Sequence, residues 1–312
     1  MSRILVTGGA GFIASELAGR LANNPDNKIV IVDNLVTGFQ SNIPDSPYKN
    51  IHFIRADVNI FDDISSVFYN YGFDYVFHYA AIVGVQRTLN QPLKVLNDIN
   101  GIKNILNLSK NTKVKRIFFA SSSEVYGEPV NIPHKEDKIP LNSRLPYAIV
   151  KTLGEAFLKS YQKEFGLDYT IFRLFNTYGT RQTSDFVIPK FITLALRNED
   201  ITIYGDGTQT RTFCYIEDNI ESTINAFYKH EYINEVINIG SDKEIQIIEL
   251  ANLIKEVTNS KSNIVHLPPL KEGEMNRRSP DISKMKNLLN RDLTWLPEGL
   301  KYVIKVPQKL NN

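Results

Sequence analysis

A tyrosine and a lysine four residues apart, Tyr147 and Lys151, are the side chains in this sequence best suited to acid–base chemistry. On a helix this spacing places both side chains on one face, within reach of one bound molecule. A phenol ordinarily loses its proton at a pH of about 10, and an ammonium held beside it favours the phenolate. Tyr147 is therefore a candidate base and Lys151 its electrostatic helper. The same spacing also arises by chance in a half-buried tyrosine beside a solvated lysine. Whether the pair is catalytic therefore has to be judged from the elements around it.

The first residues of the chain read as a strand, a glycine-rich turn, a helix and a second strand. Residues 3–7 and 28–32 are short β-branched runs, typical of strands buried on both faces of a parallel sheet. Between them, Gly8, Gly9 and Gly11 permit a tight turn and let backbone N–H groups approach a pyrophosphate at the start of the helix. Asp33 follows the second strand, where its carboxylate would accept hydrogen bonds from the adenosine ribose and repel a 2′-phosphate. The pattern predicts a dinucleotide site that prefers NAD to NADP.

Alternating strands and helices continue through residue 165. We expect further strands at 52–55, 75–79 and 114–120, and helices at 62–71, 92–111 and 143–165. Such alternation predicts an α/β fold with a Rossmann-type, doubly wound parallel sheet, whose ligands bind at the carboxyl ends of the strands. Small or polar residues stand at three of these ends, namely Asp57-Val58, Ala80-Ala81 and the run 121–127. The helix that carries Tyr147 and Lys151 would pack beside the same edge.

The alternation loosens in the second half of the chain. We expect helices at 186–197, 216–230 and 248–259 and strands at 201–204 and 236–239. An NAD-binding domain would cover residues 1–176, and a smaller α/β domain that binds the substrate would lie mainly in 177–312. The strand at 236–239 would be free to return to the first sheet. Arg211 and Arg278 are candidates for binding a diphosphate, since guanidinium groups match phosphate oxygens, although either residue fits a solvated surface as well.

The composition is that of a folded protein without a special surface. The chain has 312 residues, a net charge of +2 and one cysteine, Cys214. The small net charge argues against nucleic acid as a partner, and a single cysteine leaves no internal disulfide and suits a reducing compartment. We find no signal peptide, no apolar run near the ~18 residues of a membrane span, and no metal-ligand spacing. We therefore expect a cytoplasmic protein without membrane, metal or nucleic-acid partners.

Together these motifs resemble the extended short-chain dehydrogenase/reductase family, in its NAD-dependent nucleotide-sugar epimerase/dehydratase branch. The matches follow the family's order over nearly the whole chain. They are residues 7–14, Asp33-Asn34, Asp57-Val58, Ala80-Ala81, Ser122, Tyr147 with Lys151, and residues 173–179, 205–211 and 277–281.

The resemblance implies a role for each matching residue. Ser122 would hydrogen-bond the sugar hydroxyl that is oxidised, Tyr147 would take its proton, and Lys151 would hold the nicotinamide ribose. Hydride would pass from C4 of the sugar to NAD and leave a 4-keto sugar. The NAD site would comprise Gly8, Gly11, Phe12, Ile13, Asp33, Asn34, Asp57, Val58, Ala80 and Ala81, together with Tyr147 and Lys151. The nucleotide-diphosphate sugar would contact Ser123, Asn176, Arg211 and Arg278.

The branches of this family share the oxidation at C4 and differ in the later steps. A 4,6-dehydratase would carry an aspartate at Ser123, so this residue argues against dehydration. UDP-glucuronate decarboxylases are similar to this chain at 122–124 and 278–281, but their proline-rich loop after the small strand-end residues is absent. Residues 81–87 instead resemble the 4-epimerases. Glu124 has no necessary role in epimerisation and would act only in the other branches.

We therefore expect a nucleotide-sugar 4-epimerase. The alternatives are, in order, a UDP-glucuronate decarboxylase, a 4-dehydrogenase that releases the 4-keto sugar, and a 4,6-dehydratase. A non-enzymatic NAD sensor or scaffold would have lost Ser122, Tyr147 or Lys151, and all three are present. The nucleotide and the sugar cannot be read from these residues.

Two positions depart from the family's usual pattern. Thr180 follows Gly179 where the family usually has proline, and Asp98 stands where it usually has asparagine. The resemblance also implies a homodimer, formed by a four-helix contact between the helices at 92–111 and 143–165 of two chains.

Overall fold

The chain folds into two compact units that are each discontinuous in sequence. The computed structural model describes residues 1–127, 131–138, 141–269 and 277–305. Unit 1 comprises Met1–Val125, Ser143–Arg173 and Thr223–Ile237, and unit 2 comprises Tyr126–Asn142, Leu174–Ser222 and Asn238–Asn312. The proposed domain boundary at residue 176 stays a prediction.

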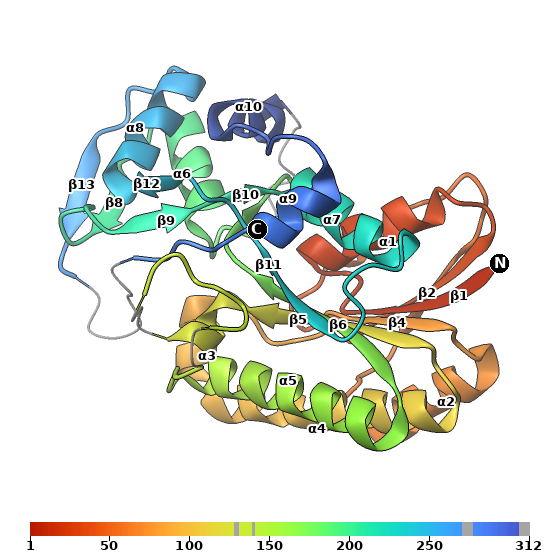
Figure 1. The fold of residues 1–312 in the computed structure, drawn as a ribbon. Coiled ribbons are helices and arrows are strands. Elements are labelled where there is room, and N and C mark those ends of the chain that lie inside the picture. Colours follow the sequence, from red (N-terminus) through yellow and green to blue (C-terminus); the bar gives the residue numbers. More distant parts are fainter. Residues whose placement is uncertain (128–130, 139–140, 270–276, 306–312) are drawn as a thin grey trace. The chain divides into compact units, whose positions relative to one another are not determined.

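Unit 1 is built on a seven-stranded sheet in the order β11-β6-β5-β4-β1-β2-β3 (Figure 1). Its strands are β1 (Ser2–Thr7), β2 (Asn27–Asp33), β3 (Ile51–Arg55), β4 (Tyr75–His78), β5 (Arg116–Ser122), β6 (Asp168–Leu174) and β11 (Glu235–Ile239). Strands β1 to β5 pair in parallel. The strand order with its switch between β1 and β4 confirms the predicted doubly wound α/β fold.

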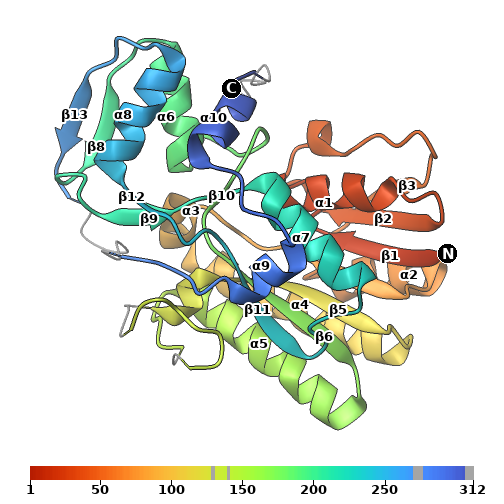
Figure 2. The same cartoon turned by 45° about the horizontal axis from the view of Figure 1, so that its top comes forward.

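Helices cover both faces of this sheet (Figures 1 and 2). They are α1 (Phe12–Ala22), α2 (Phe61–Tyr71), α3 (Val85–Asn90), α4 (Pro92–Asn111) and α5 (Pro146–Phe165), with the short 3₁₀ turns η1 (Gln40–Asn42) and η2 (Ser123–Tyr126). Helices α2, α4 and α5 lie on one face and α1 lies on the other. The inner strands β1, β2, β4, β5 and β6 are mostly buried as a result, which explains their long apolar runs, whereas the edge strand β3 is partly exposed.

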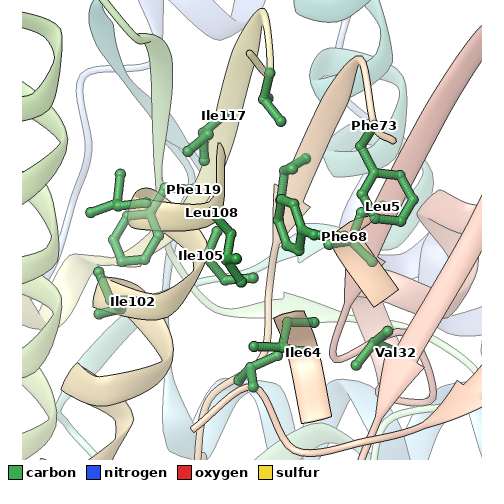
Figure 3. Close-up of a cluster of buried hydrophobic side chains, with 14 of the residues drawn as sticks. Leu5, Val32, Ile64, Phe68, Phe73, Ile102, Ile105, Leu108, Ile117 and Phe119 are labelled. Carbon is green, nitrogen blue, oxygen red and sulfur yellow. The ribbon is translucent and has the colours of Figure 1, made fainter. Parts of the chain in front are cut away.

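The core between the sheet and helices α2, α4 and α5 consists of interlocking aliphatic and aromatic side chains. Figure 3 shows part of it, with Leu5 and Ile117 from the strands against Phe68 and Ile105 from the helices. Helix α5 comes especially close to this core at Gly154, where a Cβ would lie 2.7 Å from the Phe119 ring. The missing side chain therefore lets α5 pack directly against β5.

Helix α5 and strand β5 differ from the sequence expectation at the ends that matter most for Tyr147. The helix begins at Pro146 rather than at residue 143, and Leu145 is extended, with φ −71° and ψ 135°. The residue before a proline disfavours the helical conformation, whereas proline itself is well suited to the first helical turn. Strand β5 runs on to Ser122, two residues further than expected, so this serine ends the strand itself.

A buried ion pair ties α5 to the strands beneath it. Arg173 on β6 donates two hydrogen bonds to the Glu155 carboxylate, at 2.9 Å and 2.7 Å, and Ser121 on β5 donates a third at 2.6 Å. The two charged side chains are 2% and 1% exposed. Glu155 lies one turn beyond Lys151, so the pair fixes the rotation of α5 about its axis. The two buried charges have lost their hydration, and their attraction and hydrogen bonds compensate for this loss only while both side chains are present.

Unit 2 is an α/β assembly of short two-stranded sheets and helices. The strands pair as β7 (Thr177–Tyr178) with β10 (Cys214–Tyr215), β8 (Ile201–Tyr204) with β13 (Ile264–Leu267), and β9 (Thr210–Thr212) with β12 (Glu244–Gln246). The helices are α6 (Val187–Leu196), α8 (Ile247–Thr258), α9 (Ser283–Leu289) and α10 (Leu296–Lys305), while α7 (Ile216–Tyr228) begins in unit 2 and ends in unit 1. Isoleucines and leucines of α6, α8, α10 and β8 form its core. In the described part of the chain, no helix combines the length and the apolar character that crossing a membrane requires.

Removing the charge of Glu155 should destabilise the protein strongly. In Glu155→Gln the guanidinium of Arg173 stays buried without its carboxylate, which typically costs about 3–5 kcal/mol in the free energy of unfolding. Denaturant unfolding of the variant measures this change. The matched control is Glu164→Gln on the exposed face of the same helix, which should leave stability within about 0.5 kcal/mol of wild type. Equal effects of the two substitutions would contradict the role given to the pair.

Candidate active site

The glycine turn after β1 has the geometry of a dinucleotide cradle. Gly8 adopts φ +71°, and its backbone N–H donates to the Val32 carbonyl at 2.8 Å. A Cβ at Gly8 would lie 2.7 Å from the backbone nitrogen of Ala80, so only glycine lets the turn approach the end of β4. Helix α1 starts at Phe12 with Gly11 as its N-cap, and no described side chain caps it. The N–H groups of its first turn, at Phe12 and Ile13, therefore suit a pyrophosphate.

Asp33 is held in place at the end of β2. Its carboxylate accepts hydrogen bonds from the backbone N–H groups of Ala10 at 3.0 Å and Leu35 at 2.8 Å. Burial raises the pKa of Asp33, and these two hydrogen bonds act in the opposite direction. A carboxylate has about four acceptor positions, so two remain in principle for ribose hydroxyls. The structure thus places Asp33 between the glycine turn and the loop after β2, where the sequence predicted an adenosine ribose.

The neighbouring cofactor residues are linked to one another by hydrogen bonds. The Asn34 side-chain amide donates to the Asp57 carboxylate at 2.9 Å. Asp57 also accepts the backbone N–H of Asn59 at 2.8 Å, and Val58 between them is buried. The structure brings these residues together with Ala80 and Ala81 along the carboxyl edge of the sheet in unit 1.

The predicted catalytic side chains meet at the carboxyl end of β5. Lys151 is 3% exposed and donates to the carbonyl oxygen of Ala120 at 2.7 Å. Its Nζ lies 5.0 Å from the centroid of the Phe119 ring and 5.7 Å from that of Tyr147. The Ser122 hydroxyl is hydrogen-bonded to the Tyr147 side chain and accepts the backbone N–H of Glu124 at 3.2 Å. Ser122, Tyr147 and Lys151 thus form one cluster.

The charges around Tyr147 act differently from the sequence-based expectation. Burial raises the pKa of Tyr147, the carboxylates of Glu124 and Asp98 raise it further, and the hydrogen bond from Ser122 lowers it. Burial also lowers the pKa of Lys151 to about 8. The lysine donates its hydrogen bond to the Ala120 carbonyl and not to the phenol, so in these surroundings Tyr147 is a weak acid. The expected lowering of its pKa therefore needs a further positive charge beside it.

The predicted substrate residues, apart from Ser123, lie in unit 2. The Asn176 amide donates to the Thr212 carbonyl at 3.1 Å. Arg211 lies on β9, opposite Ile245 of β12. Arg278 is 6% exposed and follows Arg277, whose guanidinium donates two hydrogen bonds to Glu244 of β12, at 2.7 Å and 2.8 Å. The segments that carry Asn176, Arg211 and Arg278 are thus fastened to one another. Ser123 is buried at the start of η2 in unit 1.

Asn238 holds the segment that carries Arg278, and no sequence pattern marks it for this role. Its side-chain oxygen accepts the hydroxyl of Tyr126 at 2.8 Å, and its amide nitrogen donates to the carbonyls of His134 at 2.8 Å and Asp281 at 3.2 Å. The side chain is fully buried. We call this arrangement the Asn238 clamp. It joins three stretches of unit 2 that are far apart in sequence.

Two further polar residues beside Lys151 were not assigned a role from the sequence. His78 ends β4, its Nδ1 lies 2.8 Å from the Thr7 hydroxyl, and burial lowers its pKa to about 3, which keeps the imidazole neutral. Asp98 on α4 is buried and carries a negative charge toward Lys151. Its departure from the family's asparagine was visible in the sequence, but only the fold shows what it faces. Among the described residues, no group of three or more His, Cys, Asp or Glu side chains is arranged to hold a metal ion.

Comparison with known proteins identifies the family. Residues 4–240 match the model of the NAD dependent epimerase/dehydratase family. The chain belongs to this family. It is therefore an enzyme of the NAD-dependent epimerase/dehydratase type, with NAD as its cofactor. This confirms the resemblance, the fold class and the cofactor predicted from the sequence.

Its relatives carry out more than one reaction. The chain is 39% identical to the UDP-N-acetyl-alpha-D-glucosaminuronate decarboxylase of Bacillus cytotoxicus, over 99% of both chains. It is 36% identical to a putative UDP-glucose 4-epimerase of Methanocaldococcus jannaschii, over 96% of this chain and 97% of the relative. The UDP-glucose 4-epimerase of Thermotoga maritima, solved with UDP-glucose, superposes with a TM-score of 0.90 at 31% identity and 97% coverage of both chains.

Loss of the Tyr147 hydroxyl should abolish sugar oxidation and spare NAD binding. Tyr147→Phe removes the proton acceptor without changing the ring, so we expect turnover to fall about 10²–10⁴-fold. Turnover and the dissociation constant of NAD measured on the same preparation test this. The control is Tyr161→Phe on the same helix, whose hydroxyl donates to the Asn107 side chain at 2.6 Å and has no catalytic role. Near wild-type turnover in Tyr147→Phe would refute the assignment.

Proposed function

We propose that the protein is a UDP-sugar 4-epimerase. It would oxidise the sugar at C4 and reduce the 4-keto sugar from the opposite face. The observation that favours this reaction is the segment 81–87 after β4, which resembles the 4-epimerases and lacks the proline-rich loop of the decarboxylases.

In this proposal each residue of the catalytic cluster has one task. Ser122 holds the C4 hydroxyl by a hydrogen bond, and Tyr147 accepts its proton as the C–O bond becomes a carbonyl. When bound, NAD would supply the hydride acceptor and the further positive charge that favours the tyrosinate. Lys151 would hold the nicotinamide ribose. In the reverse direction Tyr147 returns the proton to the new hydroxyl.

The substrate's diphosphate would be bound by unit 2. Arg211 and Arg278 would offer guanidinium groups to the phosphate oxygens, and Asn176 would offer a neutral hydrogen bond. An epimerase is expected to bind the diphosphate tightly and the sugar loosely, because the 4-keto sugar has to rotate and present its opposite face before it is reduced. The relatives named for UDP-sugars support uracil as the base.

A uronate decarboxylase is the second candidate, because two observations favour it. Ser122, Ser123 and Glu124 agree with the decarboxylase pattern, and the 39% identical relative is named as a decarboxylase of a UDP-N-acetylhexosaminuronate. After oxidation at C4 such a substrate is a β-keto acid, which loses carbon dioxide readily. The bond to carbon dioxide leaves its electron pair at C5 as an enolate, and Glu124 would then supply the proton that C5 takes up. A 4-dehydrogenase or a 4,6-dehydratase has less support from these residues.

Product mass separates the candidates. We would incubate the enzyme with UDP-glucose, UDP-N-acetylglucosamine, UDP-glucuronate and UDP-N-acetylglucosaminuronate, and measure product mass and NADH absorbance. An epimerase gives a sugar isomer of unchanged mass from the neutral substrates. Release of carbon dioxide from a uronate would overturn the proposal in favour of the second candidate. A product lighter by two hydrogens, with accumulating NADH, would indicate a 4-dehydrogenase.

The substitution Glu124→Gln tests the same question on the enzyme. Epimerisation does not use this carboxylate, so product formation should stay within about threefold of wild type, whereas loss of a general acid or base typically costs about 10²–10⁴-fold. Asn225→Gln on α7, outside the cluster, is the control. A loss in Glu124→Gln alone would contradict the epimerase mechanism.

We also propose a cytoplasmic homodimer, formed through α4 and α5. Five large apolar side chains on these helices are exposed in the single chain. Four of them, Leu93, Leu96, Ile149 and Leu153, would form the contact. A second copy of the same surface would bury them. The double variant Leu93→Glu, Ile149→Glu should sediment as a monomer while wild type sediments as a dimer. Tyr69→Glu, at an equally exposed aromatic on α2, should remain dimeric; a monomeric wild type would exclude the interface.

A further inference from the structure

Asp98 on α4 is a buried carboxylate that the proposed catalytic steps do not use. It is 9% exposed. One carboxylate oxygen accepts the backbone N–H of Ile82 at 2.8 Å, and the other lies 3.5 Å from the side-chain amide of Asn59. Ile82 follows the small residues at the end of β4, and Asn59 also accepts the Gly101 N–H at 2.9 Å. The carboxylate is thus fixed from two sides.

The packing of α4 against α5 puts Asp98 at the level of Lys151. A Cβ on Gly154 would lie 3.1 Å from the end of the Ile102 side chain, so the two helices approach each other at this height. Both helices follow parallel strands, β4 and β5, and therefore run in the same direction. Ile102 lies one turn after Asp98, and Gly154 lies about one turn after Lys151. Asp98 on α4 and Lys151 on α5 therefore lie about one turn before the point of close approach, at a similar height along the two helices.

The other groups around Lys151 do not neutralise it. From β4, His78 faces the lysine as a neutral imidazole. From β5 come the Phe119 ring and the Ala120 carbonyl, and from α5 itself the phenol of Tyr147. The Glu124 carboxylate on η2 acts on Tyr147.

From α4, Asp98 acts on Lys151 and raises its pKa against the effect of burial. Burial raises the pKa of Asp98 in turn, while the N–H of Ile82 and the charge of Lys151 favour its ionised form.

We propose that Asp98 is a positioning residue whose carboxylate supplies the counter-charge of Lys151 and holds the buried ammonium beneath Tyr147. The catalytic meaning of this inference rests on the proposed roles of Tyr147 and Lys151. The electrostatic pairing itself does not depend on the substrate. An asparagine at this position, as is usual in the family, would keep the hydrogen bond to Ile82 and lose the charge.

The direct test is the titration of Lys151 in the whole protein. Lysine labelled with ¹³C at Cε reports each ammonium by NMR, and the signal of Lys151 is identified by its absence in Lys151→Met. We expect a midpoint near the value of about 8 in wild type. In Asp98→Asn the midpoint should fall by about one pH unit, because the carboxylate that favours the ammonium is gone.

Two controls make this result specific. Asp62→Asn removes the same charge from the exposed start of α2 and should leave the Lys151 midpoint unchanged. An unchanged midpoint in Asp98→Asn, or equal shifts in both variants, would overturn the proposal. So would a wild-type midpoint below about 7, which requires no variant to fold and would mean that the ammonium is not maintained at neutral pH.

The pH dependence of turnover gives a second readout. Asp98 raises the pKa of both Tyr147 and Lys151, so its removal lowers both. In Asp98→Asn the acidic and basic limbs of kcat/KM should therefore both move toward lower pH. If Asp98 had a purely structural role, kcat/KM would fall while the pH values of both limbs stayed unchanged. That outcome would refute the proposal that Asp98 is the counter-charge of Lys151. If no nucleotide sugar is converted, the proposed function fails, while the NMR titration still decides the role of Asp98.

Discussion

The buried ammonium of Lys151 is the constraint around which unit 1 is arranged. A lysine that is 3% exposed has lost most of its hydration, so its position depends on the few groups that replace water. One hydrogen bond to Ala120, two aromatic rings and the carboxylate of Asp98 take that place. For these groups to meet, β5 has to end at Ser122, and α5 has to lie close to both β5 and α4. Gly154 permits the approach, and the Glu155–Arg173 pair fixes its orientation.

Much of unit 1 was predictable because its signals are local. The apolar runs, the glycine turn and Asp33 each depend on neighbouring residues, and they yield the general class of the sheet, the NAD cofactor and the family. The predicted start of α5 lies three residues early, although the proline that determines it is visible in the sequence. The short strands β7, β9, β10, β12 and β13 carry little periodic signal, since each has only two to four residues.

Long-range contacts could not be predicted from the sequence. The partners of Asn238 come from two stretches that are far from it in sequence, and neither Tyr126 nor Asp281 identifies this asparagine as their partner. The effect of Asp98 depends on a helix packed alongside its own. The raised pKa of Tyr147 results from burial and from two acids that stand before it in the chain but surround it only in the fold. The spacing of Tyr147 and Lys151 predicted that they lie close together, as they do in the structure, whereas the direction of their pKa shifts depends on neighbours that only the fold shows.

Between the catalytic residues Ser122 and Tyr147, the chain passes through unit 2. It leaves unit 1 just after Glu124, contributes Tyr126–Asn142 to unit 2, and returns just before Tyr147. The Asn238 clamp grips this excursion at Tyr126 and His134. A substitution that loosens the clamp would therefore act on a chain segment whose two ends adjoin Ser122 and Tyr147 in the sequence.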